Sequence, residues 1–413
     1  MSLATVFSGL VEPTIPVRFE AFDGSTWGPE DPVAVIELRR PEALQYLATA
    51  TGDLGLARAF TTGAVDVNGD LVAGLSALLR HRGQDVRWTQ RLDVLRELGP
   101  GVFRRPPIPP EEAAPAWQRG LRRHTKERDA AAIEHHYDVS NEFYALVLGP
   151  TMTYTCAVWP SESATLEQAQ DAKHELVCEK LALQPGMRLL DVGCGWGGMA
   201  RHAAHHHGVQ VLAVTLSRDQ ADWASKAVAD EGLDHLVEIR HGDYRDVVED
   251  GFDAISSIGL TEHIGTANLD SYASFLGSKL RPGGRLLNHC ITRPDGTQRA
   301  RAGRFIDRYI FPDGELVGPG RIVSTLHDNG LEVRHEENLR EHYALTCRAW
   351  LANLEAHWET CVEMVGVRRA RIWRLYLAAS AVGFEINRIQ LHQVLGVRPD
   401  AHGRSGFPLR PAY

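Results

Sequence analysis

The chain has 413 residues, of which 44% are apolar and 23% charged, and its formal net charge is −9. This length exceeds what one hydrophobic core usually holds, so we expect at least two domains. The sequence has no run of 18 apolar residues that could cross a bilayer, and its negative net charge argues against a nucleic-acid partner, whose phosphates it would repel.

The N-terminus and the cysteines both predict a cytoplasmic protein. The first 16 residues lack the basic segment and the cleavage site of a signal peptide. The six cysteines are scattered and form no CxxC pair, which is typical of reduced thiols rather than of disulfides or a zinc site.

The N-terminal part of the chain predicts a small α+β domain. We expect strand signals over residues 33–38 and 64–71, and a helix over 41–50 that opens on proline. Five prolines in residues 104–117 predict a stiff connector and hence a domain boundary. The predicted N-terminal domain, with this connector, covers residues 1–118.

A basic segment follows the connector. A charge run of this kind usually forms the solvated face of a helix. The alternative is a patch that meets anionic lipid headgroups, to which each cation contributes about 1 kcal/mol. The cations are Arg119, Arg122, Arg123, Lys126 and Arg128.

Strand-like and helical stretches alternate from residue 186 onward, which predicts a doubly wound, mostly parallel sheet with helices on both faces. After residue 343 the chain looks largely helical, and we expect this part to cap the site. This domain is predicted over residues 119–395, followed by a loosely ordered tail over 396–413. The expected strands cover residues 187–193, 209–215, 236–240, 252–258, 284–291 and 331–337.

A glycine-rich turn follows the first strand of this domain. In DVGCGWGG (191–198), Gly193, Gly195 and Gly197 let the backbone approach a ligand at the carboxyl end of the strand. The spacing differs from the dinucleotide pattern G-x-G-x-x-G and suits S-adenosylmethionine (SAM) better. The second strand ends in VTLSRDQ (214–220), without the carboxylate that usually meets a ribose.

These motifs resemble, in their order, the cyclopropane fatty acid synthases and mycolic acid cyclopropane synthases over residues 130–395. The resemblance implies a Rossmann-like class I methyltransferase fold with a helical cap. The extra N-terminal domain is similar to that of the longer, phospholipid-acting members, which implies a lipid- or membrane-associating role. The motifs, besides the glycine turn, are HYDVSNEFY (136–144), MTYTCAVW (152–159), GDYRD (242–246), EHIG (262–265), HCI (289–291), YIFPDG (309–314) and HYALTCRAW (342–350).

Three further segments, GLARAF (55–60), IGLTEHIG (258–265) and LLNHCIT (286–292), are most similar to an actinobacterial branch linked to 10-methyl fatty acids. This resemblance implies that SAM methylates an unsaturated, oleoyl-type phospholipid to a 10-methylene product, which a separate flavoprotein reduces. It also implies an enzyme that works at the membrane surface, and it makes a homodimer plausible.

The chemistry of an alkene defines what the site must do. Attack on the sulfonium methyl leaves a carbocation, which needs dry and π-rich surroundings, and Tyr309, Phe305 and Trp159 are candidate walls. Immediate proton loss from the added methyl closes a cyclopropane, whereas a prior hydride shift gives an exocyclic methylene. Both products need a base beside the methyl group.

The resemblance implies that this base is a bound bicarbonate, held by Cys156, Glu262, His289, Tyr343 and the backbone of Ile291. Imidazole, phenol and amide are the donors that a small anion requires. Glu262 is expected to orient His289 or to accept the bicarbonate proton, and Cys156 to be a weak donor rather than a nucleophile.

The resemblance also implies a set of cofactor contacts. Tyr244 is expected near the adenine, where the mycolic-acid enzymes have Trp, and Thr155 replaces Ser but keeps the hydroxyl. The expected contacts are Tyr154, Thr155, Gly193, Gly195, Gly197, Thr215, Leu216, Gln220 and Tyr244.

A metal site is not predicted. The run His205, His206 and His207 suggests metal ligands, but adjacent residues on a helix do not share a face, and no HExxH motif occurs.

Three alternatives stay open. A cyclopropane synthase acting on phospholipids would share every site residue, although Thr261 stands where such enzymes often carry Phe; we hypothesise that side chains near Thr261 influence the product. A small-molecule O- or N-methyltransferase would need neither the bicarbonate cage nor a lipid domain. A catalytically silent lipid-binding protein would not need the glycines and the cage residues, which are intact here.

Overall fold

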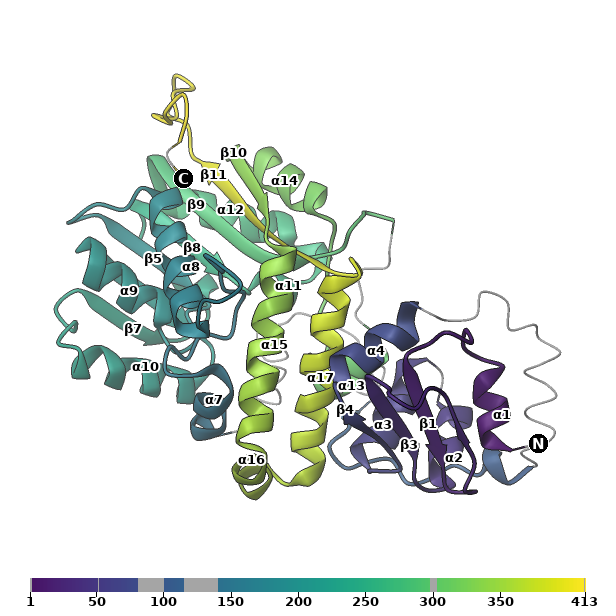
Figure 1. The fold of residues 1–413 in the computed structure, drawn as a ribbon. Helices are drawn as coiled ribbons and strands as arrows, with labels where there is room; N and C mark the ends of the chain where they lie inside the picture. Colours follow the sequence, from purple (N-terminus) through teal and green to yellow (C-terminus); the bar gives the residue numbers. More distant parts are fainter. Residues whose placement is uncertain (1, 51, 81–99, 115–139, 298–302, 412) are drawn as a thin grey trace. The chain divides into compact units, whose positions relative to one another are not determined.

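The computed structural model describes residues 2–50, 52–80, 100–114, 140–297, 303–411 and 413 (Figure 1). The basic segment over 119–131 lies outside these residues. The chain divides into two compact units. The first comprises Met1–Pro115, Gly303–Pro312 and Leu354–Ile386, and the second Ala116–Ala302, Asp313–Asn353 and Asn387–Tyr413.

The first unit is built on a four-stranded sheet in the order β2-β1-β3-β4. β1 pairs with β3 in parallel, and the other two pairs are antiparallel. The strands are β1 (Val17–Ala21), β2 (Thr26–Trp27), β3 (Ala34–Leu38) and β4 (Val65–Gly69). The helices are α1 (Leu3–Ser8), α2 (Glu42–Thr49), α3 (Asp53–Thr61), α4 (Leu71–Arg80), the 3-10 turn Pro100–Phe103, α13 (Arg304–Tyr309), α16 (Trp358–Val365) and α17 (Val367–Glu385). The predicted strands and helix of this region are confirmed.

A buried arginine ties α17 to this sheet. The guanidinium of Arg371 donates to both carboxylate oxygens of Asp66 at 3.1 Å and to the carbonyl oxygens of Phe60 and Val65 at 2.6 and 2.9 Å. It also lies over the Phe60 ring, 4.4 Å from its centroid. Charged, bidentate hydrogen bonds are the strong ones in proteins, so this contact fixes a late segment of the chain against β4.

A second buried charge ties α13 to the same unit. Glu112 accepts from Arg58 at 2.7 and 2.8 Å and from the Tyr309 hydroxyl at 3.0 Å, and pairs with Arg308 at 2.6 Å. The predicted domains follow the chain as continuous stretches, whereas the compact units do not. Long-range ion pairs, which leave no periodic pattern in a sequence, draw the two late segments to the N-terminal sheet.

The second unit contains a seven-stranded sheet in the order β10-β11-β9-β8-β5-β6-β7. The five strands from β9 to β7 run parallel, and β11 and β10 pair antiparallel. This confirms the predicted mostly parallel, Rossmann-like class I methyltransferase fold and all six expected strands. The strands are β5 (Arg188–Val192), β6 (Gln210–Thr215), β7 (Val237–His241), β8 (Phe252–Ile258), β9 (Leu280–Thr292), β10 (Glu332–Asn338) and β11 (Gln390–Val397).

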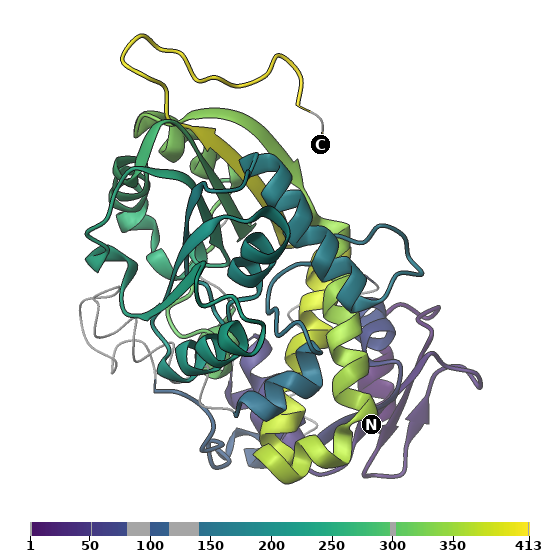
Figure 2. The same cartoon turned by 90° about the vertical axis from the view of Figure 1, so that its left-hand side faces the viewer.

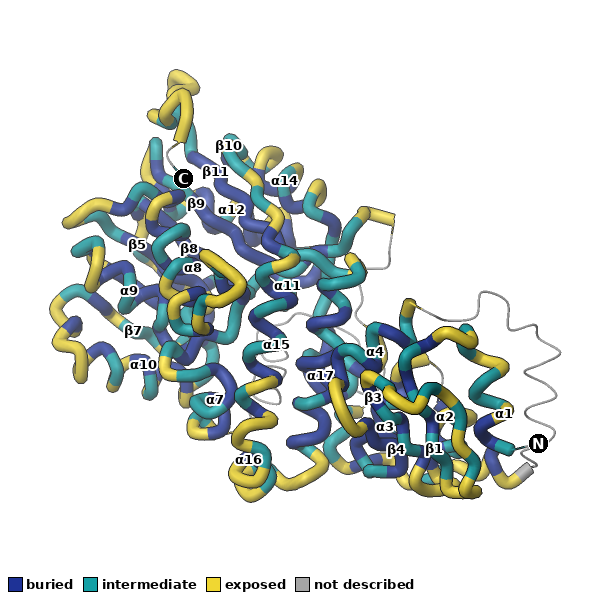
Figure 3. Tube along the Cα trace, in the orientation of Figure 1, coloured by how far each residue is buried: buried dark blue, intermediate teal, exposed yellow. Residues whose placement is uncertain are grey.

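Helices cover both faces of this sheet, which can be followed in Figure 1 and, turned by 90°, in Figure 2. Neighbouring residues of one strand face opposite sides, so Leu189 packs in one core cluster with α8 and α9, and Leu190 packs in the other with α12 and α14. In Figure 3 the central strands are accordingly buried. The helices are α7 (Asn141–Leu148), α8 (Leu166–Leu181), α9 (Gly198–His207), α10 (Arg218–Asp230), α11 (Thr261–Ile264), α12 (Leu269–Lys279), α14 (Pro319–Asp328) and α15 (Arg340–Ala356), with 3-10 turns over Tyr244–Asp246 and Thr266–Asn268.

The C-terminal part of the chain departs from the expectation. The region after residue 343 is helical only up to Glu385, and β11 then inserts between β9 and β10. This strand was not predicted because it contains the polar residues His392 and Gln393. Both side chains are buried in the structure, where each has a hydrogen-bond partner. The tail beyond β11 also packs in part, since the guanidinium groups of Arg285 and Arg334 lie 4.8 and 4.9 Å from the centroid of the Phe407 ring.

Within the described residues, no helix combines the length and the apolar character needed to cross a membrane.

Candidate functional site

The site lies at the carboxyl ends of β5 and β8. Here the chain order reverses, because β6 continues on one side of β5 and β8 returns on the other, and open α/β sheets bind ligands at such points. The glycine turn after β5 uses φ values of +76°, +55° and +78° at Gly193, Gly195 and Gly197. Residues with a Cβ rarely adopt these values, so the turn depends on glycine.

Two pockets open on this turn. The first, called the β5 pocket, extends toward α8 and includes Tyr154, Thr155 and Lys173. The second, called the β6 pocket, extends over the end of β6 and includes Thr215, Leu216 and Tyr244. Both pockets share the residues Gly193, Gly195, Gln220 and Gly259, so a ligand can follow the turn from one into the other.

Eight of the nine expected cofactor contacts line these pockets, and Gly197 does not. Gly197 precedes α9, and a Cβ there would lie 3.1 Å from the Cβ of Ala224. Its role in this structure is therefore the close approach of α9 and α10. The side chains of Thr215 and Gln220 are joined by a hydrogen bond of 2.9 Å, which fixes the wall that replaces the usual carboxylate.

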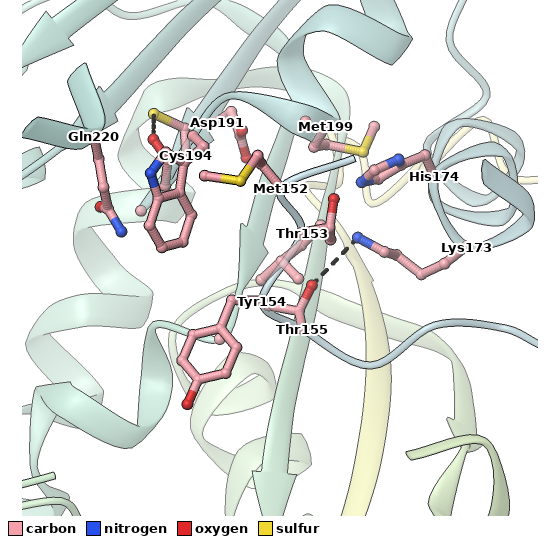
Figure 4. A pocket seen from close by; sticks show the side chains of 16 residues that line it. Met152, Thr153, Tyr154, Thr155, Lys173, His174, Asp191, Cys194, Met199 and Gln220 are labelled. Carbon is pink, nitrogen blue, oxygen red and sulfur yellow. Dashed lines mark hydrogen bonds between the residues drawn. The ribbon is translucent and has the colours of Figure 1, made fainter. Parts of the chain in front are cut away.

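The β5 pocket also contains polar residues that the sequence did not reveal as site residues. The ammonium group of Lys173 is buried and donates to the Thr155 hydroxyl at 3.3 Å (Figure 4). Gln170, from the same helix, donates to the Thr155 carbonyl at 2.9 Å. Isolated polar residues within a helix such as α8 carry no motif, so only their burial in the folded chain identifies them.

Asp191 is the second polar residue that was missed. Its Oδ1 accepts from the Ser256 hydroxyl at 2.6 Å, and its Oδ2 is buried without a hydrogen-bond partner among the described residues. Burial raises the pKa of Asp191 to about 6 and lowers the pKa of Lys173 to about 7. The pocket thus offers an acidic and a basic group, which suits the charged amino-acid end of a ligand such as SAM.

A second group of polar atoms comes from β9 and from α11, the short helix that follows β8. The Oε1 of Glu262 accepts from the Ile291 amide at 2.7 Å. The Oε2 is buried and has no partner among the described residues, although the side chain as a whole is partly exposed. Burial raises the pKa of Glu262 to about 7, so this carboxyl group can hold or release a proton near neutral pH.

The tautomer of His289 follows from its neighbours. Lys180 donates to the Oε1 of Gln393 at 2.7 Å, so the amide nitrogen of Gln393 faces His289 and donates to its Nδ1 at 3.2 Å. The Nδ1 is then an acceptor and the proton resides on Nε2. This Nε2 is buried without a partner among the described residues, and burial holds the pKa of His289 well below its usual range.

Cys156 and Tyr343 are linked through the residue that precedes α15. The thiol of Cys156 and the amide of Tyr343 both donate to the Leu339 carbonyl, at 3.8 and 3.1 Å. Burial raises the pKa of the Cys156 thiol well above its usual range, which agrees with a donor rather than a nucleophile. The buried Tyr343 ring lies edge-on to Trp350, with centroids 6.0 Å apart.

Two contacts in this structure differ from the expected ones. The Ile291 amide, expected to bind bicarbonate, holds Glu262 instead, because the carboxylate lies within hydrogen-bond distance of it. His289 is oriented by Gln393 and not by Glu262. Among the expected aromatic walls, Phe305 and Tyr309 belong to the first unit, and Trp159 donates from its indole to Thr346.

The buried carboxyl group of Glu262 predicts a pH-dependent stability. Its pKa is raised above the ordinary value of 4.5, so the folded state holds the proton more tightly than the unfolded chain. This stabilisation is complete below about pH 4.5 and is lost as the pH rises through about 7. In bicarbonate-free buffer, the free energy of unfolding should fall between about pH 5 and 8 by on the order of 2 kcal/mol more than in Glu262→Gln. The free energies are measured by urea unfolding at each pH. An equal change with pH in the two proteins would contradict the prediction.

The sheet order, the glycine turn and the two pockets define a class I SAM-dependent methyltransferase. Residues 124–394 match the family model described as mycolic acid cyclopropane synthetase. The chain belongs to this family.

Three relatives show which proteins the chain is similar to. A protein of Mycobacterium tuberculosis named "Probable fatty acid methyltransferase" is 54% identical over 404 residues, which are 96% of this chain and 94% of that protein. The cyclopropane-fatty-acyl-phospholipid synthase of Escherichia coli K12 is 37% identical over 281 residues, 68% and 71% of the two chains. The structure of mycolic acid cyclopropane synthase CmaA1 complexed with SAH and CTAB has a TM-score of 0.61 and 32% identity, and the match covers 65% of this chain and 97% of that one.

Proposed function

We propose that this enzyme transfers the methyl group of SAM to the double bond of an unsaturated, oleoyl-type fatty acyl chain in a phospholipid and releases a 10-methylene product. The observation that carries the proposal is that two buried polar atoms from the family motifs, Glu262 Oε2 and His289 Nε2, have no hydrogen-bond partner among the described residues. An O- or N-methyltransferase has no need for such a pair. The fatty acid and phospholipid substrates named for the two relatives above support the class of substrate.

The donor set fits a bicarbonate ion. The Nε2–H of His289 is a donor without an acceptor among the described residues. The single proton of the Cys156 thiol is directed at backbone carbonyls, with that of Ala157 the nearer at 3.1 Å. Glu262 Oε2, which lacks a partner in the described part of the chain, is the acceptor for the bicarbonate hydroxyl. Buried polar atoms normally have hydrogen-bond partners, so their absence here points to a small polar guest. When bound, bicarbonate supplies the base that removes a proton from the added methyl group.

The residues of the chain then have separate tasks. The Lys180–Gln393 pair keeps His289 in the tautomer that donates from Nε2. The Ile291 amide keeps the carboxyl group of Glu262 in place, and Glu262 takes up and releases a proton near pH 7. Exclusion of water protects the carbocation on the acyl chain from conversion to an alcohol.

The cofactor is proposed to lie along the two pockets, with its amino-acid end in the β5 pocket and its adenine in the β6 pocket. The SAH bound to the related CmaA1 supports this ligand class. Lys173 donates to the Thr155 hydroxyl oxygen, which leaves the hydroxyl proton to point at the ligand.

Lys173→Met should therefore weaken SAM binding about tenfold, as expected for loss of one charge-assisted hydrogen bond. Calorimetric titration with SAM measures this effect. The matched control is Lys226→Met, because Lys226 is exposed on α10 and pairs with Asp230 on the same helix. An unchanged affinity in Lys173→Met would remove Lys173 from the site.

Thr261, beside Glu262, is proposed to influence which product forms. Its hydroxyl donates to Asn288 Oδ1 at 2.7 Å, and Tyr272 donates to the same oxygen at 2.9 Å. The side chain is thus part of a buried network, and it acts on the product through the position of α11 and Glu262. We expect Thr261→Val, which removes the hydrogen bond at similar volume, to shift the methylene-to-cyclopropane ratio severalfold. A constant ratio in this variant and in Thr261→Phe would count against the hypothesis.

The test of the proposed function is product analysis. The purified enzyme is incubated with SAM and oleoyl phospholipid vesicles, and the fatty acids are identified by mass spectrometry that locates double bonds. A gain of CH2 with an exocyclic methylene at C10 supports the proposal and implies a flavoprotein reductase as a further partner. A 9,10-cyclopropane would make the chain a cyclopropane-fatty-acyl-phospholipid synthase with the same site. No gain in mass would contradict the proposed substrate.

A location at the cytoplasmic membrane surface is part of this proposal, because the acyl chain of a phospholipid has to be drawn from a bilayer. A homodimer is proposed from the family resemblance alone.

A further inference from the structure

Four potential metal ligands gather between α8 and α9, beside His174, which lines the β5 pocket and whose ring centroid lies 5.4 Å from that of His202. Glu175 and Cys178 come from α8, and His202 and His207 come from α9. We propose that these four side chains form a binding site for a divalent transition-metal ion of the zinc class. The site is separate from methyl transfer and does not rest on the proposed function.

The distances support a shared ligand. One donor atom each of Cys178, His202 and His207 lies within 4.8 Å of the others. The Oε2 of Glu175 is 3.1 Å from the Nε2 atoms of both histidines. Tetrahedral zinc, with bonds of about 2.0–2.3 Å, places its donors about 3.5 Å apart, so side-chain adjustments of roughly 1 Å would complete the site.

The helix geometry makes this convergence possible. Residues three apart share a helix face, so Glu175 and Cys178 both face α9. His202 and His207 come from the last two turns of α9, where they meet that face. The three adjacent histidines seen in the sequence are therefore not the ligand set, since His205 and His206 are exposed. Only His207 joins the site, with His202 from the preceding turn.

The types of donor select the ion. A thiol together with two imidazoles and one carboxylate suits zinc-like ions, whereas magnesium and calcium prefer oxygen ligands. Cys178 is fully buried, while the side chain of Glu175 is 43% exposed, so an ion can enter from the Glu175 side. Four protein ligands leave no open position for a substrate, which is typical of a structural site.

A second grouping competes for the same histidine. Asp171, His174 and His202 also offer donors within 4.8 Å of one another. This group lacks a thiol. The Cys178 group is favoured because the carboxylate of Glu175 already contacts both of its histidines.

The site would stabilise the cofactor pocket indirectly. α8 carries Lys173 on the wall of the β5 pocket, and α9 begins directly after the glycine turn. An ion that joins these helices would fix the distance between the wall and the turn. We therefore expect metal binding to raise the melting temperature of the enzyme and to leave the product unchanged.

The experiment titrates the metal-free, full-length enzyme with Co²⁺ and records its visible spectrum. We expect the d–d bands of tetrahedral cobalt together with a thiolate-to-cobalt charge-transfer band, both displaced by Zn²⁺. Cys178→Ser should abolish the charge-transfer band, and His207→Gln should weaken cobalt binding at least about tenfold, as expected for loss of one ligand. Circular dichroism verifies that each variant is folded.

The matched control is His206→Gln, which removes an exposed histidine from the same helix. Unchanged binding in this variant supports the proposal. The proposal is overturned if the wild-type enzyme gives no tetrahedral cobalt spectrum, or if the charge-transfer band survives in Cys178→Ser. It is equally overturned if His206→Gln or Asp171→Asn abolishes binding while His207→Gln does not.

Discussion

Glu262→Gln should lower the rate of methyl transfer to the acyl chain by about 10²–10⁴-fold, the usual contribution of a positioned proton-transfer group. The substitution keeps the size of the side chain and its hydrogen bond to the Ile291 amide, because the amide oxygen can still accept. The NH2 group that replaces Oε2 cannot accept a proton from bicarbonate. The affinity for SAM should not change, since Glu262 lines neither the β5 nor the β6 pocket.

Single-turnover kinetics with saturating SAM measures this effect, and calorimetry measures SAM affinity separately. The matched control is Glu179→Gln, which changes an exposed carboxylate on α8. Depletion of bicarbonate should slow the wild-type enzyme, and Glu262→Gln should be insensitive to it. A variant of normal rate, or one that responds to bicarbonate like the wild type, would exclude Glu262 from the proton-transfer step.

Gly195→Val should weaken SAM binding about 100-fold. Gly195 lines both pockets, and no atom lies within 4 Å of an added Cβ, so the new side chain would occupy the space of the ligand. A clash of this kind costs up to about 3 kcal/mol, and each 1.4 kcal/mol is a factor of ten in affinity. The φ value of +55° adds backbone strain, which lowers the free energy of unfolding by about 1–2 kcal/mol.

Gly232→Val separates the two effects. Gly232 also has a positive φ, +69°, and open space around its Cβ position, but it lies in the exposed turn after α10, away from both pockets. Calorimetry and urea unfolding on both variants are the measurements. We expect a similar loss of stability in both and a loss of SAM affinity in Gly195→Val alone. Equal SAM affinity in the two variants would contradict the placement of the cofactor on the turn.

The strands that position the site could be read from the sequence because each is rich in apolar residues and bounded by turn residues. The missed strand, β11, carries His392 and Gln393 in its centre. These residues look like surface residues until their partners Thr292 and Lys180 are known. The partners lie 100 and 213 residues earlier in the chain, a separation at which no local pattern survives.

The candidate site, like the fold, could be predicted from the sequence only in part. Motif resemblance singled out Glu262 and His289 as candidates, because each belongs to a short segment with a family pattern. It could not give their partners: the Ile291 amide proved to hold Glu262, and Gln393 proved to orient His289. Lys173 and Asp191 were missed because a lone polar residue in a helix or at a strand end is usually solvated or paired for structural reasons.

The sequence by itself determined the alternating α/β fold, the glycine turn and the family, because these depend on local periodicity and on short contiguous motifs. The tertiary structure alone decided which late segments join the N-terminal sheet, which tautomer His289 adopts and which histidines meet Cys178. Each of these depends on contacts between residues far apart in the chain, and the energy of such contacts depends on burial and distance, which are properties of the folded chain and not of its order.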